Sequence, residues 1–163
     1  MRAIAVINQK GGVGKTTTAV NLGHALSLQG KRVLLLDLDP QGHLAACLGL
    51  FRTPASGMDK VLLEHESLQS HAIATRELLE VVPAGLELGK FEGIDGGPER
   101  ARVLLDALKR NRPDVDYVLF DCPPSAGLLV VNAIVAADDI VVPVAGDYLS
   151  LTGLARMMGT IRK

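Results

Sequence analysis

Residue types that suit phosphate binding gather in Gln9–Thr17, directly after the first apolar segment of the chain. Its glycines let the backbone point N–H groups at phosphate oxygens, and a helix that begins there adds the positive end of its dipole. In such a loop the Lys15 ammonium offsets the charge of the β- and γ-phosphates, and the Thr16 hydroxyl ligates Mg²⁺. The strict Gly-x-x-x-x-Gly-Lys-Ser/Thr pattern fails at its first position, where Gln9 stands. The run predicts a phosphate-binding loop, the alternative being a glycine-rich turn with an incidental Lys-Thr pair.

Three acidic residues follow two further apolar segments. Asp37 and Asp39 come after Val33–Leu36, and Asp121 comes after Tyr117–Phe120. Ligands of open α/β sheets bind where the carboxyl ends of parallel strands meet, so these acids are expected at that edge. The period-two spacing turns Asp37 and Asp39 to one face if the strand persists. A lone acid at a strand end, such as Asp121, is typical of a Walker-B residue that holds Mg²⁺ through water. Ordinary solvation of strand ends, or helix capping, is the alternative for each acid.

The elements that must position these residues follow from the apolar pattern. Strands buried on both faces are predicted at Ile4–Ile7, Val33–Leu36, Tyr117–Phe120 and Ile140–Val144, with Leu79–Val82 as a weaker candidate. Helices are predicted at Thr16–Gln29, Pro98–Arg110, Leu128–Ala137 and Ser150–Ile161. The alternation indicates an α/β fold, a doubly wound and mainly parallel sheet, as one domain over residues 1–163. The glycine-rich segment Gly89–Pro98 is predicted to be a mobile surface loop.

Composition excludes several classes of protein. The chain has 163 residues, and 17 Lys and Arg against 18 Asp and Glu leave a net charge of −1, which argues against nucleic-acid or membrane binding through bulk charge. A hydrophobic content of 48% excludes disorder. The longest weakly polar stretch, Ala126–Ala137, is too short to span a bilayer. Two cysteines far apart in the chain make no disulfide framework and fit a reducing cytoplasm best.

Three segments together carry a family resemblance. Lys10–Thr17 is KGGVGKTT, Asp37–Gly42 is DLDPQG and Asp121–Ser125 is DCPPS. In these segments the chain resembles the ParA/MinD family of deviant Walker-A P-loop ATPases, and within it the ParA/Soj-like partitioning ATPases, with Lys10 as the signature lysine. The similarity is weakest between Phe51 and Asp114. It continues in order through Asn132-Ala133, Ala136-Ala137-Asp138, Pro143 and Leu151–Leu154.

The resemblance implies a role for each matching residue. The backbone of Gly11–Thr17 would bind the ATP phosphates, and Lys10 would reach across a nucleotide-sandwich dimer to the phosphates of the other subunit. Asp39 would position the attacking water. The implied catalytic residues are Lys10, Lys15 and Asp39, and the implied metal ligands are Thr16, Asp121 and Asp37. The implied nucleotide-binding residues are Lys10, Gly11, Gly12, Val13, Gly14, Lys15, Thr16, Thr17, Asp37 and Pro123.

The resemblance also implies a function. It predicts a slow, partner-stimulated ATPase that needs ATP and Mg²⁺, forms a homodimer on ATP binding and partitions a chromosome or plasmid. Implied partners are a ParB-like centromere-binding activator and non-specific DNA, bound through regions beyond this chain, in a cytoplasmic, nucleoid-associated setting. Family domains run past Lys163, so the chain is expected to lack their C-terminal part. The alternatives are a related ATPase that positions a cell-division, flagellar or chemoreceptor apparatus, and a nucleotide-dependent scaffold with little hydrolysis.

Two positions depart from the family pattern. His43 stands where partitioning members usually carry Asn, so hydrogen bonding in the switch segment is expected to differ. Asp147 stands where the family generally has Glu.

The remaining polar residues have simpler interpretations. His24, His65 and His71 show no metal-ligand spacing with one another or with the cysteines. Cys47 and Cys122 do not match the iron–sulfur pattern of the nitrogenase iron protein, and Cys122 is expected to be a small packed residue. The densest basic group is expected to be a solvated helix face, with a DNA or partner surface as the alternative; it comprises Arg100, Arg102, Lys109, Arg110 and Arg112.

Overall fold

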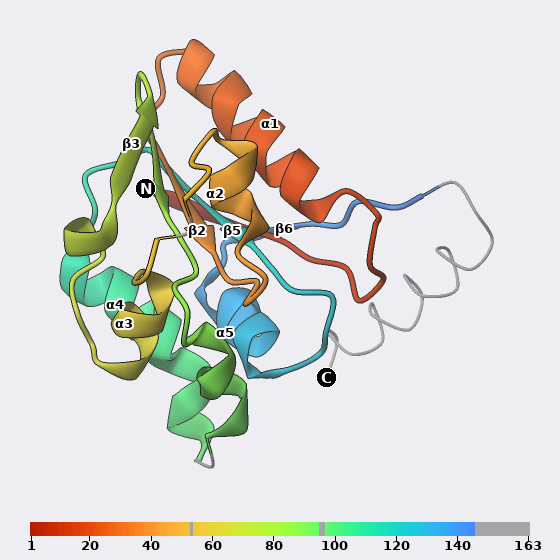
Figure 1. The fold of residues 1–163 in the computed structure, drawn as a ribbon, viewed down its shortest axis with the longest axis vertical. Helices are drawn as coiled ribbons and strands as arrows, with labels where there is room; N and C mark the ends of the chain where they lie inside the picture. Colours follow the sequence, from red (N-terminus) through yellow and green to blue (C-terminus); the bar gives the residue numbers. More distant parts are fainter. Residues whose placement is uncertain (53, 95–96, 146–163) are drawn as a thin grey trace.

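A six-stranded sheet organises the computed structural model, which describes residues 1–52, 54–94 and 97–145 (Figure 1). Within these residues the strand order is β3-β4-β2-β5-β1-β6. All neighbouring strands are parallel except β3 and β4. The predicted α/β fold with a mainly parallel sheet is confirmed. The strands are β1 (Arg2–Val6), β2 (Val33–Asp37), β3 (Ile73–Arg76), β4 (Leu79–Val82), β5 (Tyr117–Asp121) and β6 (Asp139–Val141).

The central strands are buried on both faces, which is why their sequences are continuous apolar runs. Leu34 and Leu36 of β2 belong to one apolar cluster, and Val33 and Leu35 belong to a second cluster on the opposite face. Successive side chains of a strand point to opposite faces, so each central strand must supply apolar side chains to both clusters.

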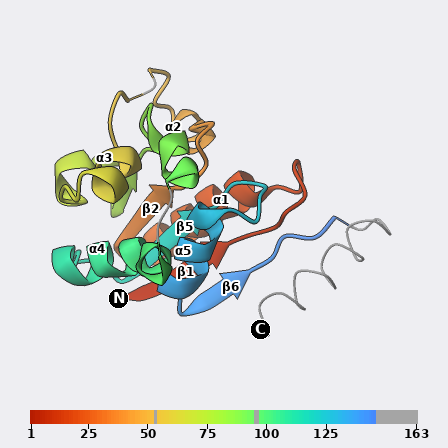
Figure 2. The ribbon, with the colours of Figure 1, turned by 90° about the horizontal axis from the view of Figure 1, so that it is seen from below.

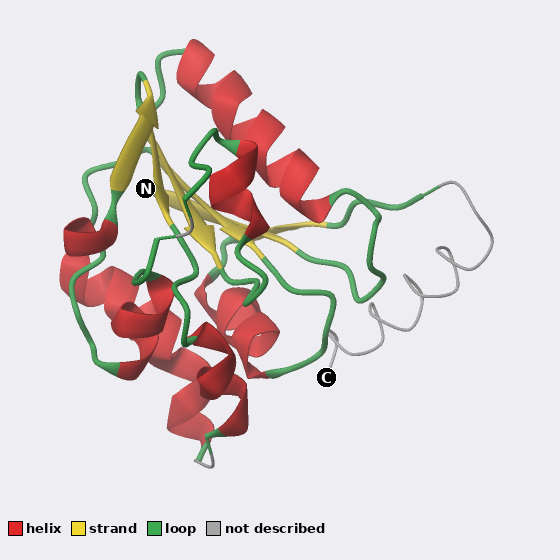
Figure 3. Cartoon of the chain, in the orientation of Figure 1, coloured by secondary structure: helices red, strands yellow, loops and turns green. Residues whose placement is uncertain are grey.

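Helices cover both faces of the sheet (Figure 3). α1 (Lys15–Leu28) and α2 (His43–Cys47) contribute to the cluster that contains Leu35. α3 (Met58–Leu63), α4 (Val103–Asn111) and α5 (Leu128–Ala136) contribute to the cluster that contains Leu36. The sheet is therefore doubly wound, as predicted. Figure 2 shows β6 at the sheet edge beside β1, with which it pairs.

Glycines let α1 lie close to the sheet and begin directly at the end of the glycine-rich loop. A Cβ atom at Gly23 would lie 2.9 Å from Leu35 Cδ2 and 3.2 Å from Leu119 Cδ1, so any larger residue would require these leucine side chains to shift. Gly14, with a left-handed φ of 89°, precedes the first residue of α1. The helix axis is thus held against the strands while its N-terminus reaches their carboxyl ends.

The prediction of a mobile surface loop over Gly89–Pro98 is wrong for Gly89–Gly93. Leu88–Gly93 is a 3₁₀ helix in which Leu88 and Phe91 are fully buried. The Glu92 carboxylate accepts hydrogen bonds from the backbone N–H groups of Leu128 (2.6 Å) and Leu129 (3.4 Å), at the start of α5. Two apolar residues three positions apart anchor this segment, and the four glycines of the predicted loop Gly89–Pro98 concealed that spacing.

Other element boundaries differ from the predictions in smaller ways. The helix predicted over Pro98–Arg110 begins as a 3₁₀ helix, Pro98–Arg102, and continues as α4. The predicted strand Ile140–Val144 is the shorter β6. The short helices α2 and α3 and the edge strand β3 were not predicted, since elements of four to six residues carry little periodicity. The helix predicted over Ser150–Ile161 lies outside the described residues.

We predict that Asn132→Leu lowers the free energy of unfolding by about 2–4 kcal/mol. Asn132 is fully buried; its Oδ1 accepts a hydrogen bond from the Leu104 N–H (3.0 Å), and its Nδ2 donates to the carbonyls of Arg100 (2.8 Å) and Leu128 (2.9 Å). Leucine would leave the Leu104 N–H, in the first turn of α4, without a partner. Urea unfolding measures the effect. The half-exposed Val131→Ala serves as a control in the same helix, and equal stability of Asn132→Leu and the wild type would contradict the prediction.

Candidate phosphate-binding site

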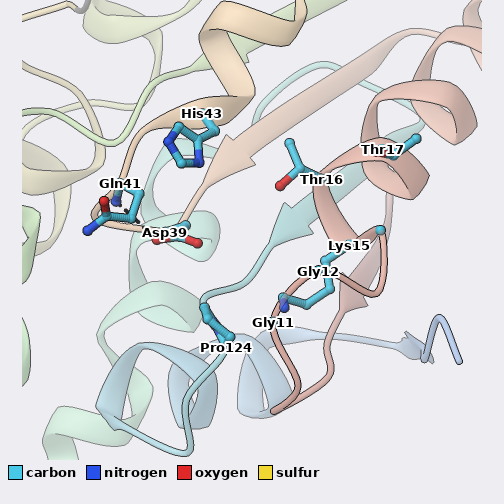
Figure 4. A pocket seen from close by; sticks show the side chains of 10 residues that line it. Gly11, Gly12, Lys15, Thr16, Thr17, Asp39, Gln41, His43 and Pro124 are labelled. Carbon is cyan, nitrogen blue, oxygen red and sulfur yellow. Dashed lines mark hydrogen bonds between the residues drawn. The ribbon is translucent and has the colours of Figure 1, made fainter. Parts of the chain in front are cut away.

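A cavity of about 410 Å³ opens where β1, β2 and β5 end (Figure 4). Side chains from the loop after β2 face the glycine-rich loop across it, and a proline from the loop after β5 completes it. Three parallel strands bring these segments together, as expected from the sequence. The lining residues are Gly11, Gly12, Gly14, Lys15, Thr16 and Thr17 from the first loop, Asp39, Gln41 and His43 from the second, and Pro124 from the third.

The glycine-rich loop needs glycine for backbone conformation at two positions. Gly12 and Gly14 have left-handed φ angles of 73° and 89°. Apart from the adjoining residues, no atom lies within 4 Å of a Cβ built at either position, so there is open space beside the loop at both glycines. The N-terminus of the fourteen-residue helix α1 lies at the end of this loop. Open space, backbone N–H groups and a helix dipole together suit an anion.

Lys15 lies inside this loop with little exposure to solvent. Its side chain is 7% exposed, and its Nζ donates a hydrogen bond to the Lys10 carbonyl (3.1 Å). Burial lowers the pKa of Lys15, whereas the charges of Asp121 and Asp39 oppose that shift. The ammonium thus donates to a backbone carbonyl and feels the charge of two carboxylates, at the edge of the cavity where phosphate charge would be neutralised.

Asp121 carries the least satisfied charge in the described part of the chain. It is 1% exposed, and neither carboxylate oxygen accepts a hydrogen bond from any described residue. Burial raises its pKa to about 6, although the nearby Thr16 hydroxyl and Lys15 ammonium lower it. The Thr16 hydroxyl is close enough to affect the pKa without meeting hydrogen-bond geometry. A buried carboxylate of this kind needs a cation or a donor.

A carboxylate and a hydroxyl are the oxygen ligands that Mg²⁺ prefers, and Mg²⁺ usually takes only one or two protein ligands beside phosphates and water. Asp121 and Thr16 fit that donor set. The described residues hold no group of three or more His, Cys, Asp or Glu side chains placed for a metal ion. Asp121 and Thr16 would supply only two ligands, so a Mg²⁺ ion bound there would take the rest from water or phosphate.

Asp37 is next to Asp121 in the sheet, and neither residue is among those that line the cavity. It is fully buried, and its oxygens accept hydrogen bonds from the backbone N–H groups of Asp39 (3.1 Å) and Leu44 (3.2 Å). Burial, and then the charge of Asp121, raises the pKa of Asp37 well above its ordinary value. Its carboxylate shapes the loop that follows β2. A role for Asp37 in holding the metal or the nucleotide stays a prediction.

The loop after β2 presents every second side chain to the cavity. Asp39 Oδ1 accepts a hydrogen bond from the Gln41 N–H (3.0 Å), and the Gly42 N–H donates to the Asp39 carbonyl (2.9 Å). Gly42 is left-handed, with φ of 66°, and precedes α2 at His43. Asp39, Gln41 and His43 therefore share one wall (Figure 4). Gln41 was not predicted, although its place in the DLDPQG segment was a usable signal.

Several other predicted site residues lie outside the cavity wall. Lys10 is exposed at the start of the glycine-rich loop. Val13 lies in the middle of the same loop and is half-buried. Pro123 is buried, and its neighbour Pro124 lines the cavity instead. The direction of a side chain at this turn could not be predicted from its place in the DCPPS segment.

The residues given simpler interpretations agree with the structure where it describes them. Cys122 is buried, and burial raises its pKa well above the ordinary value, so it is a packed thiol. In the basic group, Arg102, Lys109, Arg110 and Arg112 are exposed. Arg100 lies over the Phe91 ring, 5.2 Å from its centroid. Of the helices formed by described residues, none combines the length and apolarity that crossing a membrane requires.

Comparison with known proteins identifies similar chains. A family model described as an AAA domain, AAA_31, matches residues 1–163. The chain is 42% identical to the sporulation initiation inhibitor protein Soj of Bacillus subtilis, over 99% of this chain and 65% of that protein. It is 44% identical to the chromosome partitioning protein ParA of Caulobacter vibrioides, over 100% of this chain and 63% of that protein. The chain thus spans less than two thirds of the length of these two relatives.

A solved structure shares the fold of this chain. The crystal structure of cobyrinic acid a,c-diamide synthase from Mycobacterium smegmatis, with bound ATP analogue and magnesium, matches with a TM-score of 0.90 and 40% identity. The match covers 99% of this chain and 67% of that chain.

We predict that Asp121→Asn stabilises the metal-free and nucleotide-free protein more at pH 8 than at pH 5. The folded pKa of about 6 exceeds the ordinary value of 3.8, so the stability that protonated Asp121 contributes is fully present below pH 4 and lost as the pH rises through 6. The loss approaches roughly 3 kcal/mol, and asparagine avoids it because it carries no charge.

Thermal unfolding in a chelator at both pH values measures this difference. Asp106→Asn, on an exposed part of α4, controls for the removal of one surface charge. A stability difference between Asp121→Asn and the wild type that is the same at pH 5 and pH 8 would contradict the assignment of this burial cost to Asp121.

Proposed function

Because the chain belongs to the AAA_31 family, with ParA- and Soj-like P-loop ATPases among its relatives, we propose that it binds Mg-ATP in this cavity and hydrolyses it slowly. The observation that carries the proposal is the pair of buried Asp121 oxygens without hydrogen bonds, beside the Thr16 hydroxyl and the Lys15 ammonium. A carboxylate left in that state is suited to a divalent cation that arrives with a polyphosphate.

Each loop has a separate task in this proposal. The N–H groups of Gly11–Thr17, Val13 and Thr17 among them, bind the phosphates, and the Lys15 ammonium exchanges the Lys10 carbonyl for a phosphate oxygen. Asp121 and Thr16 hold Mg²⁺, which when bound offsets phosphate charge during transfer. Pro124, which lines the cavity, and Pro123 border the nucleotide.

Asp39 positions the attacking water. Its backbone is held by Asp37, and one of its own oxygens accepts the Gln41 N–H, so the carboxylate has a defined direction beside the cavity. Phosphoryl transfer passes through a loose transition state, and therefore positioning and charge stabilisation supply most of the catalysis. An oriented carboxylate that accepts a hydrogen bond from the water would provide the positioning.

Lys10 acts across a dimer. It is exposed at the start of the loop, rather than part of the cavity wall. In this proposal its ammonium reaches phosphates held by a second copy, which would make dimer formation depend on ATP. Two lysines and a metal ion then share the charge of one triphosphate.

The cycle of ATP binding, dimerisation and hydrolysis serves DNA partitioning. Both relatives named above, Soj and ParA, carry names linked to sporulation or chromosome partitioning, and for this reason we favour partitioning over the synthase activity in the name of the M. smegmatis structure. A ParB-like activator, non-specific DNA bound through regions beyond Lys163, and a cytoplasmic, nucleoid-associated location complete the proposal. Sedimentation with DNA, with and without ATP, in a longer chain tests it.

We predict that Lys15→Ala and Lys10→Ala lose different properties. Removing the Lys15 ammonium leaves phosphate charge under-neutralised in a preformed anion site, so Mg-ATP affinity falls by about a hundredfold or more. Lys10→Ala keeps nucleotide binding by the monomer but loses ATP-dependent dimers. Titration calorimetry measures the first property and light scattering the second, with the exposed Lys109→Ala as a control. Unchanged affinity in Lys15→Ala would sink the phosphate-site assignment, and ATP-dependent dimers in Lys10→Ala would refute the action in trans.

We predict that Asp39→Ala separates ATP binding from hydrolysis. Turnover falls by about tenfold or more because the water loses its acceptor. ATP affinity stays unchanged or rises slightly, since a negative charge near the phosphates is removed. Phosphate release and calorimetry in one buffer measure the two properties, and Asp106→Ala on α4 is the control. Wild-type turnover in Asp39→Ala would transfer the role to another acid.

A further inference from the structure

The first turn of the phosphate-binding loop is made without glycine. The strict pattern places glycine where this chain has Gln9. Among the non-glycine residues that the structure describes, His65, Leu78 and Arg112 alone have positive φ angles, so Gln9 enters the loop without a left-handed conformation. The loop has its first left-handed residue only at Gly12. Another interaction must therefore direct the backbone from β1 into the turn.

Asn8 supplies that interaction with its side chain. Its Oδ1 accepts a hydrogen bond from the Lys10 N–H (3.0 Å), two residues along the chain, which is an Asx turn. Its Nδ2 donates to the Pro143 carbonyl (2.8 Å), in the segment after β6. The residue is 7% exposed, so both bonds are shielded from water. The bond to Pro143 thus fixes the orientation of the Asn8 amide, and the bond to Lys10 fixes the orientation of the Lys10 peptide group.

The Lys10 peptide unit is in turn connected to the ammonium of the phosphate site. The Lys10 carbonyl accepts a hydrogen bond from Lys15 Nζ (3.1 Å). Three hydrogen bonds therefore run in sequence from Pro143 to Asn8, from Asn8 to Lys10, and from Lys10 to Lys15. Both the N–H and the C=O of Lys10 are held.

We infer that Asn8 is a positioning residue which, through an Asx turn at the Lys10 N–H, replaces the missing first glycine of the phosphate-binding loop and holds the Lys10 backbone against the Lys15 ammonium. The inference rests on the proposed binding of Mg-ATP. A loop that is already ordered loses less conformational entropy when the ligand binds. Asn8 therefore raises the affinity for the nucleotide without contacting it.

A purely structural role for Asn8 would be to tie β1 to the segment after β6. That connection exists without its side chain, because β1 pairs with β6 and the Ile7 N–H donates to the Val141 carbonyl (3.0 Å). The bond to Lys10, inside the loop, adds nothing to strand pairing. It bears only on the conformation of the loop.

The test compares Asn8→Ala and Asn8→Ser with a matched asparagine elsewhere. Asn111 makes the same two kinds of bond away from the cavity: its Oδ1 accepts the Leu68 N–H (3.1 Å), and its Nδ2 donates to the Ala107 carbonyl (2.6 Å). A serine hydroxyl at position 8 can still accept the Lys10 N–H but is too short to bond Pro143 as well. Titration calorimetry gives the affinity for Mg-ATP, and thermal unfolding gives the stability.

We expect Asn8→Ala to bind Mg-ATP about tenfold more weakly, the effect of one hydrogen bond of ordinary strength. Asn8→Ser should lie between Asn8→Ala and the wild type. Asn111→Ala should lose stability at unchanged affinity. Wild-type affinity in Asn8→Ala, in a preparation where Lys15→Ala has lost binding, overturns the inference and leaves the proposed function standing.

Amide hydrogen exchange in the ligand-free chain gives a second, independent readout. The Lys10 amide should exchange at least about tenfold faster in Asn8→Ala than in the wild type and be unaffected in Asn111→Ala. Equal exchange rates of the Lys10 amide in Asn8→Ala and the wild type overturn the inference, whether or not the wild type binds ATP. A wild type that does not bind ATP would refute the proposed function. If Asn8→Ala does not fold, the wild-type Lys10 amide decides: slow exchange supports the Asx turn, and exchange at the rate of an unstructured peptide overturns it.

Discussion

The in-register pairing of β2 with β5 places two buried carboxylates, Asp37 and Asp121, side by side at the carboxyl ends of these strands. Neighbouring negative charges that are removed from water repel one another and resist ionisation, and burial raises the pKa of both groups. Asp37 is stabilised by two backbone N–H groups. Asp121 accepts no hydrogen bond from the described residues. The remaining charges of the site are arranged around this carboxylate.

The loop after β1 supplies the opposite charge. Lys15 is held near Asp121 and Asp39 although burial disfavours its charged form, and the N-terminus of α1 adds its dipole on the same side. These positive groups only partly offset the carboxylates, and the cavity between them is open to a ligand that brings both phosphate oxygens and a cation. Sites of this kind reduce the stability of the empty protein and recover it on binding, the usual relation between function and stability.

Much of this site could be predicted because its signals are local. Glycine spacing in Gln9–Thr17, and acids that directly follow apolar runs, depend on a few consecutive residues. The positions of Pro124 and His43 in the cavity wall could not be predicted, since side-chain directions in turns depend on the bonds that hold the turn. The segment Gly89–Gly93 was misjudged because the predicted loop Gly89–Pro98 holds four glycines, whereas only two apolar residues, Leu88 and Phe91, anchor it in the core.

The sequence by itself determined that the chain forms a mainly parallel α/β sheet and that a phosphate-binding loop and three acids meet at one edge, because buried strands must be apolar on both faces and parallel strands share their carboxyl ends. Only the tertiary structure decided how each polar group is satisfied. Asp37 and Asp121 look alike in the sequence, each an acid that ends a strand, yet one binds the backbone of its own loop and the other lacks a partner in the described chain. Nothing in the sequence distinguishes Asn8 from other polar residues; its amide is oriented by the carbonyl of Pro143, which is far along the chain. Hydrogen bonds between distant segments exist only after the sheet has brought those segments together, and for that reason no local pattern records them.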